Sequence, residues 1–329
     1  MLLNKGRAKS FPIRVLVVSV VLLALQLCNL FQSSTRAKPF QGTPRKIVSD
    51  DFTKHRQQTA SGATTGKAAQ GARISSDVKP RQQTKRTYRL ASQTKADSLP
   101  KNQNAPVAQL GITIWRLRPP SSNESAGSAR MLVREKSKTT ELIPVRVEAD
   151  TTFLEGDQIR LSIESPLTGY LYVVDRDLFA DGSMGPAMLI YPWADKDGYD
   201  NRMRPGRLVD IPAQEDQPAY FTAKRSSANQ IGEVLTVIVT SSPLSLSISD
   251  KPILIPKAEL SNWEKMWSGN SERFEMDGGA GETWTSAEQQ ASAHSGSRQL
   301  TREDPAPQTI YRVSGVDDKA FLVNVRLNY

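Results

Sequence analysis

The sequence predicts an all-β protein: an immunoglobulin-like antiparallel β-sandwich with a short helical insertion, preceded by a disordered basic tether. From residue 110 onward, short apolar runs bounded by Gly, Pro and Asp recur about every ten residues, which is the strand spacing of a sandwich. Several runs alternate apolar and polar side chains with period two. Residues 38–109 hold few large apolar residues, too few to offset the entropy of ordering that segment.

Nine segments predict the strands of this sandwich. Within residues 157–165, Ile159 and Ile163 fall on one face while Arg160 and Glu164 fall on the other. Such alternation is typical of an antiparallel sheet with one face in water, so we expect the polar face to be exposed. The predicted strands are residues 111–117, 142–149, 157–165, 169–175, 187–193, 207–212, 219–223, 233–241 and 321–329.

One short helix is expected, within an insertion at residues 258–300 of the domain that spans residues 110–329. Ser261 and Glu264 have the spacing of a capping box ahead of apolar residues, which predicts a helix near residues 260–274. The stretch that follows is polar and rich in Gly and Ser. We expect it to be a mobile excursion rather than a site.

The N-terminal residues 1–37 have the layout of an export signal: a basic leader and then the apolar run VLVVSVVLLAL. The apolar stretch continues to residue 31, slightly short of the roughly 20 residues of a spanning helix. Two alternatives therefore remain, a cleaved signal peptide or an anchor that contacts the membrane through residues 15–31. Bulky Leu27 before Cys28, the only cysteine, argues against a lipoprotein. Either way we expect export to the periplasm or cell envelope.

The positive charge of the chain is concentrated in its first third. The net charge of +9 divides into +5 for residues 1–37, +10 for residues 38–109 and −6 for residues 110–329. The folded part is thus mildly acidic, and we expect no nucleic-acid partner. The basic tether is expected to be a soluble spacer; nonspecific attraction to anionic lipid or wall polymer is the alternative.

The order of the motifs in residues 145–244 resembles a known family. The motifs are GDQIRLSIESPLTGYLYVVDRD, LIYPW, GRLVDIP and GEVLTVIVTSSPL, and together they resemble the bacterial domain of unknown function 4384 over about a third of the chain. The resemblance implies a β-sandwich accessory or interaction domain, often attached to other modules in bacterial envelope or signalling proteins. It implies no catalytic residues.

Asp175, Asp177 and Asp181 are the candidate metal ligands of the sequence. A calcium loop resembling an EF-hand needs an oxygen donor at position 5 and a glutamate at position 12. Counted from Asp175, these positions hold Phe179 and Pro186. We therefore expect the segment to be a hairpin connection. A looser calcium site would need these aspartates to converge with the later acidic residues at positions 195 and 197.

The sequence offers few of the histidines that many catalytic sites use. The chain has two histidines, His55 and His294, so a Ser/His/Asp triad or a histidine-rich zinc site is not expected. A carboxylate-based hydrolase is the exception that composition allows, yet nothing in the sequence selects an acid pair. We expect no enzyme and no cofactor.

Six aromatic residues suggest that the domain binds a glycan. Aromatic faces stack on sugars, although alternating aromatics more often pack in a core. The sequence thus predicts an exported, non-catalytic β-sandwich interaction module of the bacterial cell envelope that binds a protein or envelope partner. The alternative is a glycan- or calcium-binding module. The aromatic residues are Tyr170, Tyr172, Tyr191, Trp193, Tyr199 and Tyr220.

Overall fold

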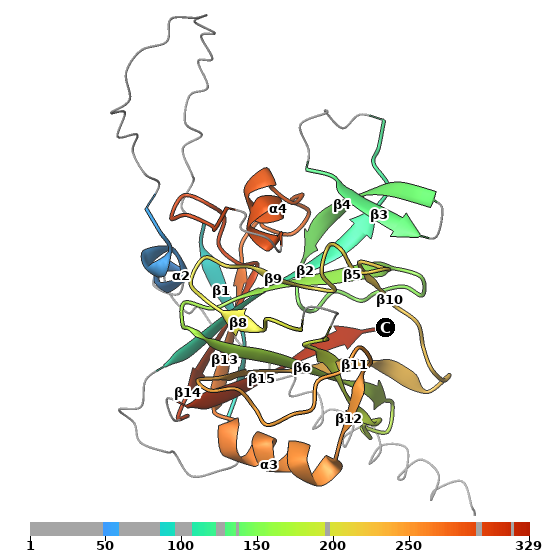
Figure 1. Ribbon diagram of the computed structural model, residues 1–329, viewed down its shortest axis with the longest axis vertical. Coiled ribbons are helices and arrows are strands. Elements are labelled where there is room, and N and C mark those ends of the chain that lie inside the picture. Colours follow the sequence, from blue (N-terminus) through green and yellow to red (C-terminus); the bar gives the residue numbers. More distant parts are fainter. Residues whose placement is uncertain are drawn as a thin grey trace, which may run out of the picture. The chain divides into compact units, whose positions relative to one another are not determined.

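The described part of the chain folds into two antiparallel sheets of nine and six strands, with helices on their outer surfaces (Figure 1). The antiparallel β-sandwich that the sequence predicts is therefore confirmed. The predicted signal or anchor at residues 1–37 lies outside the described residues. The computed structural model describes residues 49–58, 86–95, 107–122, 129–135, 138–194, 198–293, 298–316 and 319–329.

The first sheet is centred on β2 (Ala108–Arg118). One edge of β2 pairs with β5 (Gln158–Glu164), and the other edge is shared by β14 (Thr309–Ser314) and β4 (Lys138–Val147). The remaining strands of this sheet are β13 (Asn270–Met276), β1 (Tyr88–Thr94), β3 (Met131–Glu135), β9 (Val209–Ile211) and β10 (Phe221–Thr222).

The second sheet has the order β12-β7-β6-β11-β15, with β8 also paired to β6. Its central strands are β6 (Gly169–Phe179) and β11 (Gln230–Thr240), and β15 (Ala320–Asn328) forms one of its edges. The shorter strands are β7 (Ala187–Tyr191), β8 (Arg202–Met203) and β12 (Ile253–Ile255).

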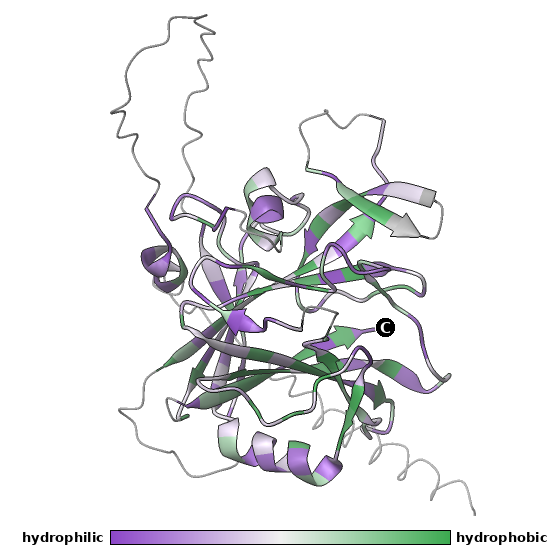
Figure 2. Cartoon of the chain, in the orientation of Figure 1, coloured by the Kyte–Doolittle hydropathy of each residue, from purple (hydrophilic) through white to green (hydrophobic). Residues whose placement is uncertain are grey.

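The core lies between the two sheets. Leu110 and Ile163 of the first sheet share it with Val173, Val237 and Val323 of the second sheet. These positions follow the period-two alternation of each strand. Hydrophobic colouring accordingly concentrates on the strands of both sheets, whereas α2 is largely hydrophilic (Figure 2).

The expectation that the polar face of β5 is in water is wrong. Arg160 and Glu164 are only 1% and 3% exposed. Arg160 pairs with Asp210 of β9, and Glu164 pairs with Arg56. Each buried charge therefore has an opposite charge supplied by another segment, which is the condition under which charges are tolerated in an interior.

Two segments of the predicted linker at residues 38–109 belong to the fold. Helix α2 (Asp50–His55) buries Phe52 beside Tyr88 of β1 and Phe274 of β13. Strand β1 pairs along β13. The predicted domain boundary at residue 110 is therefore too late, and the other linker residues lie outside the described part of the chain.

The helical insertion differs from its prediction in three ways. Helix α3 (Lys257–Trp267) begins after Pro256, so the expected capping box at Ser261 lies inside the helix. Residues 270–276 form β13 rather than the end of the helix. The capping box of the structure joins Thr285 and Glu288 at the start of α4 (Ser286–Ser292).

Most of the expected mobile excursion is therefore part of the fold. It contains α4 and the buried Trp284, which contacts Trp115 across the outer face of the first sheet. Helix α3 lies on the opposite side of the sandwich, where Leu260 and Trp263 cover the outer face of the second sheet (Figure 1). Among the described residues, each outer face of the sandwich thus carries a helix.

Candidate functional site

The three aspartates that the sequence singles out divide between a strand and a turn. Asp175 ends the predicted strand at residues 169–175, but β6 continues to Phe179, so Asp177 is also a strand residue rather than part of a connection. Asp181 lies in the exposed turn that follows, where its Oδ1 accepts hydrogen bonds from the Ser183 amide (2.9 Å) and hydroxyl (2.6 Å). These bonds lower the pKa of Asp181. Its role is the turn stabilisation typical of aspartate.

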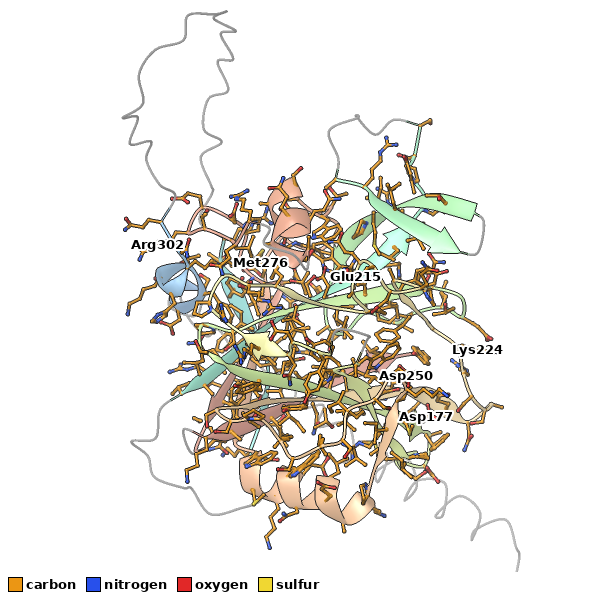
Figure 3. The ribbon with its side chains drawn as sticks, in the orientation of Figure 1. Asp177, Glu215, Lys224, Asp250, Met276 and Arg302 are labelled. Carbon is orange, nitrogen blue, oxygen red and sulfur yellow. The ribbon has the colours of Figure 1, made fainter. Side chains whose placement is uncertain are left out.

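Asp175 and Asp177 instead face the other sheet, together with Glu233 of β11. They have the same parity along β6 as the core residue Val173, and Asp177 lies directly opposite Glu233. The Asp177 carboxylate accepts a hydrogen bond from Ser226 Oγ (2.9 Å). Figure 3 labels Asp177 at the lower right of the view. We call Asp175, Asp177 and Glu233 the acidic cluster.

Asp175 and Glu233 of the acidic cluster have raised pKa values. Burial, followed by the charges of Glu233 and Asp177, raises the pKa of Asp175 to about 7. Oδ1 of Asp175 is buried without a hydrogen-bond partner among the described residues. Burial also raises the pKa of Glu233, although a hydrogen bond with Tyr329 acts in the opposite direction. Asp175 therefore takes up a proton near neutral pH.

Metal-binding geometry is absent from the described residues. They contain no group of three or more His, Cys, Asp or Glu side chains that could hold a metal ion. Asp195 and Asp197 lie outside them, so their convergence with the other aspartates stays a prediction. His55 is exposed on α2, and His294 lies outside the described part of the chain.

The six aromatic residues that suggested a sugar platform are divided among separate layers. Tyr172 is buried beneath α3, while Tyr220 lies in the cluster on the outer face of the first sheet. Tyr191 packs against the central core. Trp193 and Tyr199 are exposed, at 40% and 44%. The aromatic set is thus mainly structural.

Buried acids on the outer face of the first sheet are bound by arginines. Glu288 of α4 pairs with Arg146 of β4, and both side chains are at most 4% exposed. The Arg146 guanidinium also lies over the Trp115 ring, 5.2 Å from its centroid. Arg160 lies in the same way over Trp284, at 5.3 Å. These contacts fix α4 and its preceding loop to the sheet.

A cavity of about 590 Å³ opens along β15, between the two sheets and the C-terminal end of α3. We call it the β15 groove. Its walls combine hydroxyl groups, cations and the strand itself. The lining residues are Ser92, Thr94 and Lys95 near the end of β1, Glu264, Lys265, Ser268 and Gly269 at the end of α3, Ser271, Arg273 and Tyr311 from β13 and β14, and Leu322, Val323, Asn324 and Arg326 from β15.

The hydrogen bonds at the two ends of β15 establish which of its backbone groups are paired with β11. The Tyr329 amide donates to the Ile231 carbonyl (3.0 Å), and the Ser241 amide donates to the Lys319 carbonyl (2.7 Å). Both pairs fit the unbroken register of β11 with β15. Hydrogen-bonded and non-hydrogen-bonded pairs alternate along an antiparallel ladder. The odd-numbered residues of β15 therefore bond to β11.

The even-numbered residues of β15 direct their backbone groups to the other side. The Asn328 carbonyl accepts a bond there from the Phe153 amide (2.8 Å), as this geometry requires. Leu322, Asn324 and Arg326 line the β15 groove, and no described strand pairs with them on that side. The groove thus contains an open strand edge.

Three cations at the β15 groove lack acidic partners. Lys95, Lys265 and Arg326 are exposed and form no ion pair with the described residues. The other charged lining groups are neutralised, because Glu264 pairs with Arg176 (2.7 Å) and Arg273 pairs with a carboxylate of the turn after β4 (2.6 Å). The groove is therefore basic, although residues 110–329 carry a net negative charge.

A second cavity of about 560 Å³ lies beside β4 and has a different character. Its cations and anions already have partners. Arg116 pairs with Asp157, and Glu148 pairs with Arg89. The buried Arg146 is bound by Glu288, as described above. The β15 groove is therefore the stronger candidate for a charged ligand.

The residues of the β15 groove were not identified from the sequence. Lys95 falls in the predicted linker and Lys265 in the predicted helix. The alternation within residues 321–329 places Asn324 and Arg326 on a polar face, which is the available signal for this site. No local pattern relates Lys95 to Arg326, because the pairing of β1 with β13 brings Lys95 to the groove.

No family model, curated protein or solved structure matches this chain.

Proposed function

We propose that this protein is an exported, non-catalytic interaction module of the bacterial cell envelope, and that it binds a protein partner in the β15 groove. The observation that carries the proposal is the open edge of β15 within a cavity of about 590 Å³. An open strand edge presents a row of unpaired backbone donors and acceptors that another chain can pair with, so an open edge inside a groove favours binding of another chain.

Further support comes from the sequence and from the buried acids. The basic leader and apolar run at residues 1–37 favour export. The resemblance to the bacterial domain of unknown function 4384 also favours an accessory or interaction role. Glu164, Glu288 and Asp210 are each paired with a buried arginine, which supports a structural role for these carboxylates.

Among the helices of the described residues, none has both the length and the apolar content needed to cross a membrane. The predicted anchor, residues 15–31, lies outside them. Cell fractionation together with determination of the mature N-terminus tests export. We expect the protein in the envelope or periplasmic fraction, and recovery only in the cytoplasm would contradict the proposal.

Site-specific photo-crosslinking tests the binding surface. A photoreactive amino acid placed at Thr94, an exposed residue of the β15 groove, is expected to crosslink the full-length chain to a discrete protein in cells. The same amino acid at Leu154, which is 71% exposed and does not line the groove, is the matched control. Equal adducts from both positions, or none from Thr94, would reject the groove as the binding surface.

The alternative function is a glycan- or calcium-binding module. Calorimetric titration of the full-length chain with calcium chloride and with peptidoglycan fragments separates it from the proposal. We expect no saturable heat in either titration. Saturable calcium binding that disappears in Asp175→Asn would favour the alternative, and turnover of generic hydrolase substrates would contradict a non-catalytic role.

A further inference from the structure

We propose that the β15 groove binds an acidic peptide segment in an extended conformation, as an added strand on β15. This inference rests on the proposed function and specifies the chemistry and conformation of the partner. Two independent features of the groove carry it. One is the direction of the backbone groups of β15, and the other is the charge of the walls.

The backbone geometry specifies an extended partner. Leu322, Asn324 and Arg326 each direct an amide and a carbonyl to the open side of β15. These groups repeat every second residue, over about 14 Å of strand. An extended chain about five residues long matches this repeat with main-chain hydrogen bonds, as in strand addition to an exposed sheet edge.

The surroundings of the open edge limit where the added strand can lie. At the Asn328 end, the Phe153 amide already occupies the carbonyl that faces outward. From Leu322 to Arg326 the edge instead faces the cavity, whose lining also includes Ser92, Thr94 and Ser271. The added strand is therefore placed along Leu322 to Arg326, in a cavity that also contains hydroxyl groups.

The charges of the walls specify an acidic partner. Lys265 of α3, Arg326 of β15 and Lys95 near the end of β1 all lack acidic partners among the described residues. Successive side chains of a strand point to opposite faces, so carboxylates spaced two residues apart share one face of the added strand. Such a segment supplies the missing counter-charges while its backbone pairs with β15.

A second copy of this chain fits the groove less well than an acidic partner. The full-length chain carries a net charge of +9, so two copies repel each other at long range. Unpaired cations beside a strand edge also have a protective use, because charge on an edge discourages pairing with another strand. Reversing the charges distinguishes the two roles of the cations, because it should weaken binding of an acidic peptide if they recognise a partner and allow the edges of two copies to pair if they protect the edge.

Binding of short peptides to the full-length protein tests the inference. The probe is a synthetic peptide of about seven residues with alternating Glu and Thr, measured by fluorescence anisotropy. One matched peptide replaces Glu by Lys, and another keeps Glu but carries N-methyl groups on alternate amides of the hydrogen-bonding edge. We expect saturable binding of the acidic peptide, and binding at least about tenfold weaker for both matched peptides.

Charge reversal locates the site. In the double variant Lys265→Glu and Arg326→Glu, we expect the acidic peptide to bind at least about tenfold more weakly and the lysine peptide to gain affinity. Lys224→Glu, at an exposed cation that does not line the groove, is the control and should retain wild-type binding. Unchanged unfolding midpoints confirm that both variants fold.

Four results would overturn the inference. Equal binding of the N-methylated peptide would mean a simple anion pocket without strand addition. Binding of oligogalacturonate in place of the acidic peptide would identify an acidic polysaccharide site. Dimerisation of the charge-reversed variant without peptide binding to wild type would assign the cations to edge protection. No binding of the acidic peptide at about 1 mM also overturns it.

The two proposals fail separately. If photo-crosslinking from Thr94 captures a partner but the acidic peptide does not bind, the interaction module stands and the acidic strand is wrong. If Thr94 does not crosslink to a protein in cells while the acidic peptide binds β15 in vitro, the proposed cellular function is wrong although the groove has the inferred chemistry.

Discussion

The buried charged residues of this protein fall into two groups, those that pair with an opposite charge and those that do not. Arg160 and Asp210 are both 1% exposed in their side chains and lie 2.6 Å apart. Asp175 has no comparable partner, and its nearest charges include Glu233 and Asp177. The first arrangement compensates for lost hydration, whereas the second favours the protonated carboxyl. The acidic cluster should therefore make stability depend on pH.

Asp175→Asn is expected to remove much of that pH dependence. The pKa of Asp175 is about 7 in the folded protein, above about 3.9 in an unfolded chain. Between these values the folded state binds more protons, so stability falls as pH rises. By urea unfolding, we expect the variant to be about 1 to 2 kcal/mol more stable than wild type near pH 8 and similar to it near pH 4.

Asp181→Asn is the matched control for this prediction. Asp181 is exposed, and its hydrogen bonds with Ser183 lower its pKa, so its ionised form contributes stability at high pH rather than removing it. We therefore expect no stabilisation of this control near pH 8. A variant Asp175→Asn that is less stable than wild type near pH 8 would contradict the account of the acidic cluster.

At the scale of the elements, the helices are attached in two ways. Helix α3 covers the second sheet with apolar side chains such as Trp263. Helices α2 and α4 border the first sheet with one buried apolar residue each, Phe52 and Ala291. Each is also held by a buried ion pair, Arg56 with Glu164 beside α2 and Arg146 with Glu288 in α4. Removing one member of a buried pair leaves the other charge without compensation. The attachment of α4 should therefore depend strongly on Glu288.

Glu288→Ala is expected to destabilise the protein by about 3 to 5 kcal/mol. The substitution leaves the buried Arg146 guanidinium without its counter-charge, and it also removes the capping box of α4. Glu141→Ala breaks the exposed pair of Glu141 with Arg130 and should cost less than about 1 kcal/mol. Denaturant unfolding of both variants gives the comparison. Equal losses would show that α4 is not held by the buried pair.

At the scale of the whole molecule, local sequence patterns predicted most strands, whereas contacts between residues distant in sequence were not predicted. The alternation of Ile159 with Ile163 correctly located β5, and apolar runs located most strands of the core. Strand β14, which contributes Tyr311 and Val313 to the core, was not predicted. The fate of Glu164 was predicted wrongly, because its partner Arg56 is distant in sequence and lies within a basic, apolar-poor segment. Strand β13 was missed because the apolar residues before it extended the predicted helix.

Some residues of the candidate site could likewise be identified locally, but their arrangement depends on pairing between distant strands. The sequence identified Asp175 and Asp177 but ended the strand at Asp175 and placed Asp177 in the connection, since the hydrogen-bond register that extends β6 depends on β11. Glu233 was not associated with them for the same reason. The open edge of β15 has no sequence signature, because an edge is defined by which strand is absent beside it. Fold class is thus encoded locally, while the site is created by topology.

The inclusion of α2 and β1 in the fold predicts the effect of shortening the chain. A chain of residues 49–329 retains Arg56 and Tyr88 and should unfold at the midpoint of the full-length protein. A chain of residues 110–329 loses both, leaving Glu164 without its partner and Phe274 without its cover. We expect it to be less stable by at least about 3 to 5 kcal/mol in urea unfolding; equal midpoints would contradict the structure.

Amide hydrogen exchange of β15, followed by NMR on the full-length protein, tests the central claim most directly. Without peptide, the amides of Leu322, Asn324 and Arg326 should exchange much faster than those of Val323 and Val325, which bond to β11. The acidic peptide should slow the three even-numbered amides by at least about tenfold. Protection of all five amides without peptide, or no change on adding it, would contradict an open β15 edge that binds an extended partner.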